Sequence, residues 1–211
     1  MEGKRIRIVT CSQWLGNEAK KSALLSQQDI ITIPNPIDTH RYRPSDKKKA
    51  RQLLGLPVDG HIILFASQRV TNPNKGMQYL IEACKLMASE HPDCCANTSI
   101  AILGGHAEEI AHLLPFPTHA LGYVNDEQRI VATYNAADVF VLPSLSENLP
   151  NTIMEAMACG VPCVGFRVGG IPEMIDHEQN GYVANFRDAA DLALRSEERR
   201  VGKECRSRWS P

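Results

Sequence analysis

Short apolar runs alternate with amphipathic segments along most of this chain, and this alternation is what most constrains its fold. Several runs are apolar on both faces, for example those within residues 61–67, 99–104 and 139–143. Strands that are buried on both faces occur in parallel sheets that helices cover on each side. The strands expected from these runs span residues 6–11, 30–34, 61–67, 99–104, 120–124, 139–143, 162–166 and 182–184.

Helical patterns lie between the expected strands. The clearest has apolar residues at three- and four-residue steps, which is the spacing of one helical stripe, at Met77, Leu80, Ile81, Cys84 and Met87. Further helices are expected over residues 47–54, 126–136 and 151–159. The alternation therefore predicts an α/β fold with a Rossmann-like, doubly wound parallel sheet.

Prolines mark a boundary near the N-terminal side of this series. Three of them fall within residues 34–46. We therefore expect residues 1–34 to end an upstream domain, residues 35–45 to form an interdomain linker, and residues 46–194 to form the main domain. Residues 195–211 carry six Arg and Lys against three Glu and lack apolar periodicity. They are interpreted as a non-native tail, and the alternative is a genuine basic tail that binds acidic lipid or a partner.

Composition argues against several classes of protein. A formal net charge of −1 gives no electrostatic basis for general nucleic-acid binding. No apolar run is long enough to span a membrane, and the N-terminal run is too short for a signal peptide. The seven cysteines show no repeated CxxC spacing, which argues against a zinc site or a disulfide framework. Reduced thiols fit a cytoplasmic protein.

Two basic residues follow one of the expected strands. Arg69 comes directly after the run at 61–67, and Lys75 lies beside Gly76 at the start of the next helical pattern. Open parallel sheets bind ligands at the carboxyl ends of their strands. Two cations near a helix start suit a diphosphate, because arginine binds two phosphate oxygens and lysine adds a point charge. Solvated surface charge is the alternative interpretation.

Two carboxylates lie near a second strand end. Glu147 follows the run at 139–143, and Glu155 lies eight positions later, one turn into the helix expected from Asn151. Pro150 fixes the entry of the chain into that helix, whose first N–H groups attract an anion. The carboxylates would then bind hydroxyls of a sugar and of a ribose. Helix capping is the alternative, because residues 144–147 and 152–155 both match the capping-box pattern.

Together these residues resemble the E-x7-E signature of retaining glycosyltransferases with the GT-B fold, in particular glycosyltransferase family 4, also called glycosyl transferases group 1. The resemblance extends from about Val9 to about Leu194 and includes the linker run Pro-Asn-Pro-Ile-Asp at 34–38. It is densest over residues 121–175. The chain resembles the C-terminal, donor-binding domain of that family, preceded by the strand and helix that close the N-terminal domain.

The resemblance implies a role for each candidate. Arg69 and Lys75 would bind the donor diphosphate, and with Glu147 at the donor sugar they would form the catalytic group. Glu155 would bind the ribose. The backbone of three residues would meet the base: Gly122, Tyr123 and Val124. One loop would meet the phosphates and the sugar hydroxyls: Asn148, Leu149, Pro150, Asn151 and Thr152.

The implied reaction is transfer of a hexose from a UDP- or GDP-linked sugar to a glycan or lipid-linked acceptor, in polysaccharide or glycolipid biosynthesis. No cofactor and no metal are expected, because no Asp-x-Asp pair occurs in the sequence. The acceptor, and any peripheral contact with the inner face of a membrane, would involve a missing N-terminal domain. The chain alone is therefore expected to be inactive.

Two other classes of protein stay open at this point. One is a different GT-B enzyme, such as a sugar-nucleotide epimerase or a phosphorylase. The other is a nucleotide-binding module without catalysis. A dehydrogenase module lacks support, because no G-x-G-x-x-G follows a first strand.

Overall fold

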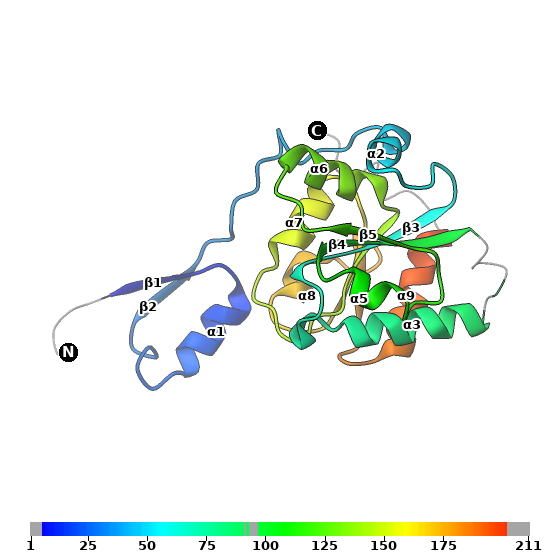
Figure 1. The fold of residues 1–211 in the computed structure, drawn as a ribbon. Helices are drawn as coiled ribbons and strands as arrows, with labels where there is room; N and C mark the ends of the chain where they lie inside the picture. The colour runs from blue at the N-terminus through cyan, green and yellow to red at the C-terminus, as the bar shows by residue number, and fades with distance from the viewer. Residues whose placement is uncertain (1–5, 91, 93–96, 202–211) are drawn as a thin grey trace.

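A six-stranded parallel sheet forms the centre of the molecule. The computed structural model describes residues 6–90, 92 and 97–201, arranged as Figure 1 shows. The strand order is β5-β4-β3-β6-β7-β8, and every neighbouring pair runs parallel. The strands are β3 (His61–Arg69), β4 (Thr98–Gly105), β5 (Thr118–Gly122), β6 (Val139–Leu142), β7 (Cys163–Phe166) and β8 (Gly181–Ala184). The predicted doubly wound parallel sheet is confirmed.

Helices cover both faces of this sheet, because alternate residues of each strand point to opposite sides. Ile62 and Leu64 of β3 belong to one hydrophobic cluster, which includes residues of α2 (Lys47–Leu54), α6 (Glu127–Ala136) and α7 (Asn151–Ala158). Ile63 and Phe65 belong to the other, which includes residues of α3 (Met77–Glu90) and α9 (Ala189–Val201). The described part of the unit also includes the short helical segments η1 (Pro73–Lys75), α5 (Glu108–Ala111) and α8 (Ile171–Met174).

Local sequence explains where the helices begin and end. Asp46 caps α2 by accepting hydrogen bonds from the backbone N–H groups of Lys48 and Lys49, and Asp126 caps α6 by accepting one from that of Gln128. Gly55 ends α2 in the left-handed conformation, at φ 67°. The helix predicted over residues 47–54 therefore has the predicted bounds, and that over 126–136 differs only in that Asp126 is its cap.

The N-terminal residues form a small unit of their own. It consists of β1 (Arg7–Thr10), α1 (Gln13–Lys21) and β2 (Asp29–Thr32), and β1 pairs in parallel with β2 in a separate two-stranded sheet. We call these residues, 6–33, the upstream unit. An extended segment joins it to α2 and carries the prolines that suggested a linker (Figure 1).

The expected domain limit at residue 194 lies inside α9. That helix continues to Val201. Within it, Arg195 pairs with Asp191 and the Ser196 side chain is buried. Residues 202–211 of the proposed non-native tail lie outside the described residues. The domain limits thus stay predictions.

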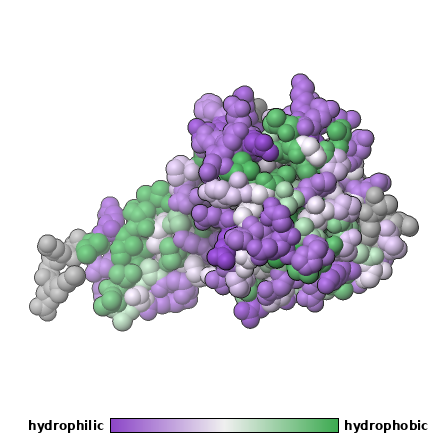
Figure 2. All heavy atoms as spheres, viewed as in Figure 1, coloured by the Kyte–Doolittle hydropathy of each residue, from purple (hydrophilic) through white to green (hydrophobic). Residues whose placement is uncertain are grey.

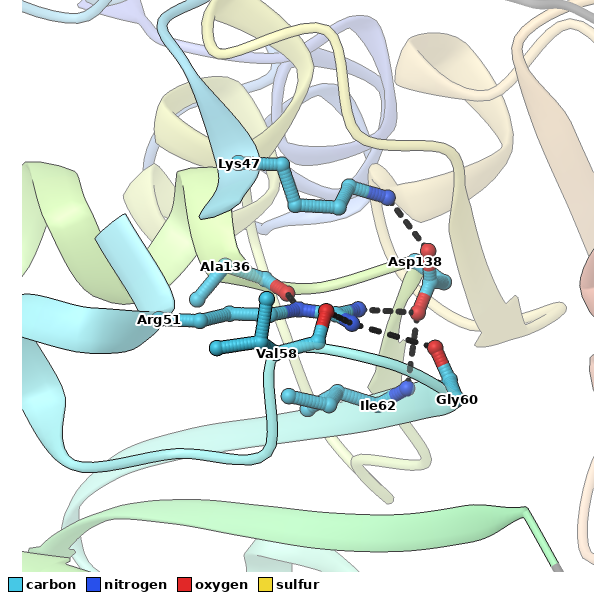
Figure 3. Close-up of polar contacts among 7 residues, drawn as sticks. All are labelled: Lys47, Arg51, Val58, Gly60, Ile62, Ala136 and Asp138. Atoms are coloured by element: carbon cyan, nitrogen blue, oxygen red, sulfur yellow. Dashed lines mark hydrogen bonds and ion pairs between the residues drawn. The ribbon is translucent and has the colours of Figure 1, made fainter. Parts of the chain in front are cut away.

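A partly buried ion-pair network holds α2 at the end of the sheet where β3 and β6 begin (Figure 3). The carboxylate of Asp138 pairs with Lys47 and with Arg51, and accepts a hydrogen bond from the backbone N–H of Ile62 at 2.7 Å. The Arg51 guanidinium also donates to three backbone carbonyls: Val58, Gly60 and Ala136. This network lies at the opposite end of the strands from the predicted ligand site, so its role is structural.

Candidate functional site

The two strands at the centre of the sheet define where a ligand would bind. From β3 the chain adds β4 and β5 on one side, and then β6, β7 and β8 on the other. The loops after β3 and β6 therefore leave the sheet in opposite directions, and such a switch point is where open α/β sheets bind ligands. Arg69 is the last residue of β3, and Glu147 lies in the loop after β6. Both predicted residues thus lie at the switch point.

Lys75 and Glu147 form an ion pair across this switch point. The Lys75 Nζ lies 2.5 Å from a Glu147 carboxylate oxygen, and their side chains are 30% and 12% exposed. The two loops are also joined through their backbones, because the N–H of Leu145 donates to the carbonyl of Asn74 at 2.8 Å. The structure therefore brings together the cation expected at the diphosphate and the carboxylate expected at the sugar.

Gly76 makes this approach possible. Its φ is 69°, and a Cβ there would lie 1.8 Å from the carbonyl oxygen of Pro143, at the end of β6. A side chain at this position would push the two loops apart. Lys75 and Gly76 lie directly before the long helix, as predicted: Lys75 ends the separate turn η1, Gly76 is the left-handed cap of that turn, and its carbonyl accepts the first hydrogen bonds of α3.

Arg69 lies on the same edge of the sheet, and its guanidinium contacts a hydroxyl group. Its Nε donates to the Thr71 hydroxyl at 3.1 Å, and within the described part of the chain it forms no ion pair. Glu147 neutralises one of the two cations at the switch point, which leaves one net positive charge from Arg69. That charge and the guanidinium geometry suit a phosphate.

The start of α7 completes this edge. Pro150 is the N-terminal cap of the helix, as predicted, but no side chain caps it by a hydrogen bond. Neither predicted capping box forms: Thr152 lies inside α7, and the buried Ser144 hydroxyl has no hydrogen-bond partner among the described residues. The capping alternative is therefore wrong for both glutamates. The first amides of α7 carry a partial positive charge that no capping side chain offsets.

Glu155 is held by a tyrosine that sequence reasoning missed. The Tyr134 hydroxyl donates to its carboxylate at 2.6 Å. Burial raises the pKa of Glu155, and hydrogen bonds from Tyr134 and Tyr42 oppose that rise. Burial, followed by the charge of Glu155, also raises the pKa of the nearby Cys159 thiol to about 12. Cys159 is therefore a protonated, unreactive thiol.

The segment expected at the base lies two strands away. Gly122 ends β5 at φ 68°, and Tyr123 and Val124 follow the strand. The Tyr123 side chain is 59% exposed, whereas Val124 packs against a hydrophobic cluster of the sheet. Two strand spacings separate β5 from β3, or about 10 Å. These residues share the ligand edge, but no contact described in the structure joins them to Lys75 or Glu147.

The predicted loop at residues 148–152 faces the upstream unit and the start of the segment that follows it. The Asn148 side chain accepts a hydrogen bond from the Ser12 hydroxyl at 2.5 Å, and Asn151 accepts one from Asn35 at 3.3 Å. Leu149 and Thr152 are half-buried. No local sequence pattern indicates these contacts, because the partners lie more than a hundred positions away.

Two further properties bear on the site. Among the described residues, no group of three His, Cys, Asp or Glu side chains could hold a metal ion. The same residues include no helix with the length and apolar character that a membrane span requires. Metal independence, like the absence of a cofactor, stays a prediction from the sequence.

Comparison with known proteins identifies the family. The sequence profile of the family described as glycosyl transferases group 1 matches residues 60–198, which is more than half of the chain. The chain belongs to this family. Among relatives of this chain, D-inositol 3-phosphate glycosyltransferase 2 of Catenulispora acidiphila is 31% identical over 178 residues. That alignment covers 78% of this chain and 40% of the relative, so the chain spans about two fifths of the relative's length.

Solved structures share the fold of this chain. Anabaena Alr3699/HepE in complex with UDP-glucose is 26% identical with a TM-score of 0.68, over 88% of this chain and 51% of that chain. The C-terminal domain of the group 1 glycosyl transferase LpcC from Francisella tularensis is 20% identical with a TM-score of 0.64, over 81% of this chain and 91% of that domain. The expected C-terminal half of a GT-B fold is confirmed.

Proposed function

We propose that this chain is the donor-binding part of a glycosyltransferase that transfers a hexose from a UDP- or GDP-linked sugar. The observation that carries the proposal is the Lys75–Glu147 ion pair at the switch point, with Arg69 beside it. Family membership and the UDP-glucose complex of the similar HepE protein support a nucleotide sugar as the ligand. The acceptor is a glycan or a lipid-linked glycan, and it binds mainly to an N-terminal domain outside this chain.

The proposed mechanism depends on charge that develops on the leaving diphosphate. Arg69, Lys75 and the first amides of α7 stabilise that charge without a metal, as preorganised donors do in a site of low polarity. Glu147 positions the sugar and stabilises the positive charge that forms at its anomeric carbon. Glu155 accepts hydrogen bonds from the two ribose hydroxyls. A carboxylate that is already fixed by Tyr134 loses little conformational entropy on binding.

The stereochemical outcome that we propose is retention, by attack of the acceptor on the face that the diphosphate leaves. In this mechanism the departing phosphate takes the proton of the acceptor hydroxyl. In this mechanism Glu147 is not the nucleophile, and its carboxylate, which pairs with Lys75 at 2.5 Å, only positions the sugar and stabilises its charge. A double displacement through a glycosylated Glu147 is the alternative for retention.

The other GT-B activities fit the site less well. A phosphorylase of this fold would require a lysine-bound cofactor, and the only lysine that we assign to the site, Lys75, is paired with Glu147. An epimerase of nucleotide sugars would use the same donor site without an acceptor. A domain that only binds nucleotides would not need a carboxylate at the sugar position.

A titration of this chain separates these functions. The chain is titrated by calorimetry with UDP, UDP-glucose, GDP, GDP-mannose and NAD. We expect one nucleotide and the corresponding nucleotide sugar to bind, and NAD to give no binding heat. Binding of NAD without UDP or GDP would reject the proposal. A longer chain that also carries the N-terminal acceptor domain is then assayed with a panel of UDP- and GDP-sugars. Release of nucleotide only in the presence of acceptor would support transfer over epimerisation.

A further inference from the structure

Glu173 connects the main unit to the first turn of α1. One oxygen of its carboxylate accepts a hydrogen bond from the backbone N–H of Gln13 at 2.7 Å, and the other accepts one from that of Trp14 at 2.6 Å. Both amides are at the start of α1, where a helix has unsatisfied donors and a partial positive charge. The carboxylate therefore joins the two units through Gln13 and Glu173, which are 160 positions apart in the sequence.

Next to this contact, the cap of α1 meets the loop that carries the candidate site. The Ser12 hydroxyl accepts from the N–H of Leu15 at 3.1 Å and donates to the Asn148 side-chain oxygen at 2.5 Å. The Asn148 amide nitrogen lies 2.8 Å from the Cys11 sulfur. A hydroxyl has one proton to donate, so Ser12 commits it to Asn148. Asn148 is the residue after Glu147, which pairs with Lys75.

Two glycines let the Glu173 segment pack against the same loop. A Cβ on Gly169, whose φ is 57°, would lie 1.6 Å from the Glu147 carbonyl oxygen. A Cβ on Gly170 would lie 2.1 Å from the Asn148 carbonyl oxygen, and the Gly170 N–H donates to that oxygen at 2.8 Å. The backbone of Glu147 and Asn148 is thus held on one side by the two glycines, while Ser12 binds the side chain of Asn148.

We propose that Glu173 is a positioning residue for the donor sugar. By binding the first amides of α1, it holds Ser12 against Asn148, and Ser12 in turn fixes the loop in which Glu147 meets the sugar. This inference rests on the proposed donor site. It adds that the sugar part of the site depends on the upstream unit, whereas the nucleotide part, at Glu155 and β5, does not contact Glu173 or Ser12 in the structure.

The test uses this chain with two variants and a control. Glu173→Gln removes the charge that binds the two amides, and Ser12→Ala removes the hydroxyl that binds Asn148. Glu178→Gln, a few residues along the same segment, changes a glutamate whose side chain is 69% exposed and lies 3.8 Å from the His177 ring. Calorimetry measures the affinity for UDP-glucose and for UDP, or for GDP-mannose and GDP if the wild type prefers them. Hydrogen exchange follows the amides of residues 13–15.

We expect both variants to bind the nucleotide sugar about five- to tenfold more weakly, with the affinity for the free nucleotide changed less than twofold. In Glu173→Gln, exchange at Gln13 and Trp14 should also rise about tenfold. The control should match the wild type in both measurements.

Three results would contradict the inference. The first is an unchanged affinity for the nucleotide sugar in both variants. The second is an equal loss for the sugar nucleotide and the free nucleotide, because that would indicate general damage to the fold. The third is a wild-type chain that binds neither UDP-glucose and UDP nor GDP-mannose and GDP. That result would reject the proposed function itself, and it differs from the first two because it is seen in the wild type, without any variant. If Glu173→Gln does not fold, Ser12→Ala alone decides between the expected result and the first two.

Discussion

Tyr134 on α6 holds the carboxylate of Glu155 on α7 through a hydrogen bond of 2.6 Å. The Tyr134 ring is almost fully buried, with its edge against Phe140 and near Tyr42. Its packing therefore fixes where the hydroxyl points. Burial, followed by the charge and the hydrogen bond of Glu155, raises the pKa of Tyr134 well above its usual value, so the hydroxyl stays a donor at any ordinary pH.

The Tyr134→Phe substitution should weaken nucleotide binding without loss of the fold. The ring and its edge contacts remain, but the carboxylate loses the donor that orients it. We expect the dissociation constant for UDP or GDP to rise about fivefold, which corresponds to about 1 kcal/mol for one hydrogen bond. Calorimetry checks this. Tyr79→Phe is the control, because Tyr79 packs on Phe166 at the other face of the sheet; an equal effect there would contradict the role of Tyr134.

The Glu155 carboxylate should reduce the free energy of unfolding of the chain at neutral pH. Its pKa is raised in the folded chain by burial, so the folded state holds the proton to higher pH than the unfolded state does. Stability therefore falls as pH rises from the usual range of a glutamate through the raised pKa, and it stays reduced above that pKa. Glu155→Gln removes this cost.

We expect Glu155→Gln to have a larger free energy of unfolding than the wild type at pH 7 and about the same value at pH 3.5. Its affinity for the nucleotide should fall, because an amide accepts fewer hydrogen bonds from ribose than a carboxylate. Urea denaturation at the two pH values tests the first statement. A variant that is less stable than the wild type at pH 7 would show that the carboxylate is stabilising there.

The two members of the Lys75–Glu147 pair should affect different steps. In a longer chain that also carries the N-terminal acceptor domain, Glu147→Gln should lower kcat by about 100-fold or more. The nucleotide affinity should change by less than about threefold. Lys75→Met should weaken nucleotide binding by about tenfold, because it removes a charged donor to the diphosphate. Lys48→Met, on the exposed face of α2, is the control.

Steady-state kinetics and calorimetry separate these effects. The result against our assignment of Glu147 would be a glycosylated Glu147 trapped by mass spectrometry, since it would make this carboxylate the nucleophile.

The network around Asp138 predicts a loss of stability in acid. Burial alone would raise the pKa of Asp138, but the hydrogen bond and charge of Lys47, with smaller contributions from the Ile62 N–H and from Arg51, hold it below its usual value. Such a carboxylate stabilises the fold above the pKa of the unfolded chain, about 4, and this contribution is lost as pH falls through the lowered pKa.

Asp138→Asn should therefore cost about 3 kcal/mol of unfolding free energy at pH 7, since Arg51 is left buried without its partner. The difference from the wild type should shrink between about pH 4 and pH 2. Affinity for the nucleotide should not change, because the network lies at the other end of the strands. Denaturation curves across this pH range test the prediction, with Asp59→Asn, in an exposed turn, as the control.

The sequence predicted the sheet because its signal is local. A run that is apolar on both faces marks a central strand wherever it occurs. All eight expected strands are present, with ends within two residues of the predicted ones. The edge where Arg69, Lys75 and Glu147 gather follows from the same pattern, since parallel strands end on one side. Local patterns also misled at the two capping boxes, where tertiary contacts decide what each side chain binds.

What could not be predicted depends on pairs that are far apart in the chain. Tyr134 meets Glu155 across 21 positions, and Ser12 meets Asn148 across 136. Nothing near Tyr134, Ser12 or Glu173 in the sequence signals a polar partner. These residues become visible only when the packing of α6 on α7, and of α1 on the loops after β6 and β7, is known.

The upstream unit exposes apolar side chains that a soluble surface rarely presents together. Val9 of β1 is 55% exposed and Ile33, just after β2, is 56% exposed, and Ile6 and Leu24 of the same unit are also exposed. Figure 2 shows apolar residues over much of the visible face of this unit. A surface of this kind normally contacts another protein surface. The chain by itself should therefore associate with copies of itself.

We expect size-exclusion chromatography with light scattering to show species larger than a monomer at tens of micromolar, within the usual range for weak association. Val9→Thr combined with Ile33→Thr should shift the distribution toward the monomer, because threonine keeps the β-branched shape that a strand favours and removes apolar area. Leu53→Lys is the matched control, since Leu53 is equally exposed but lies on α2, away from the upstream unit. A monomer in the wild type, or an equal shift in the control, would show that this surface does not drive association.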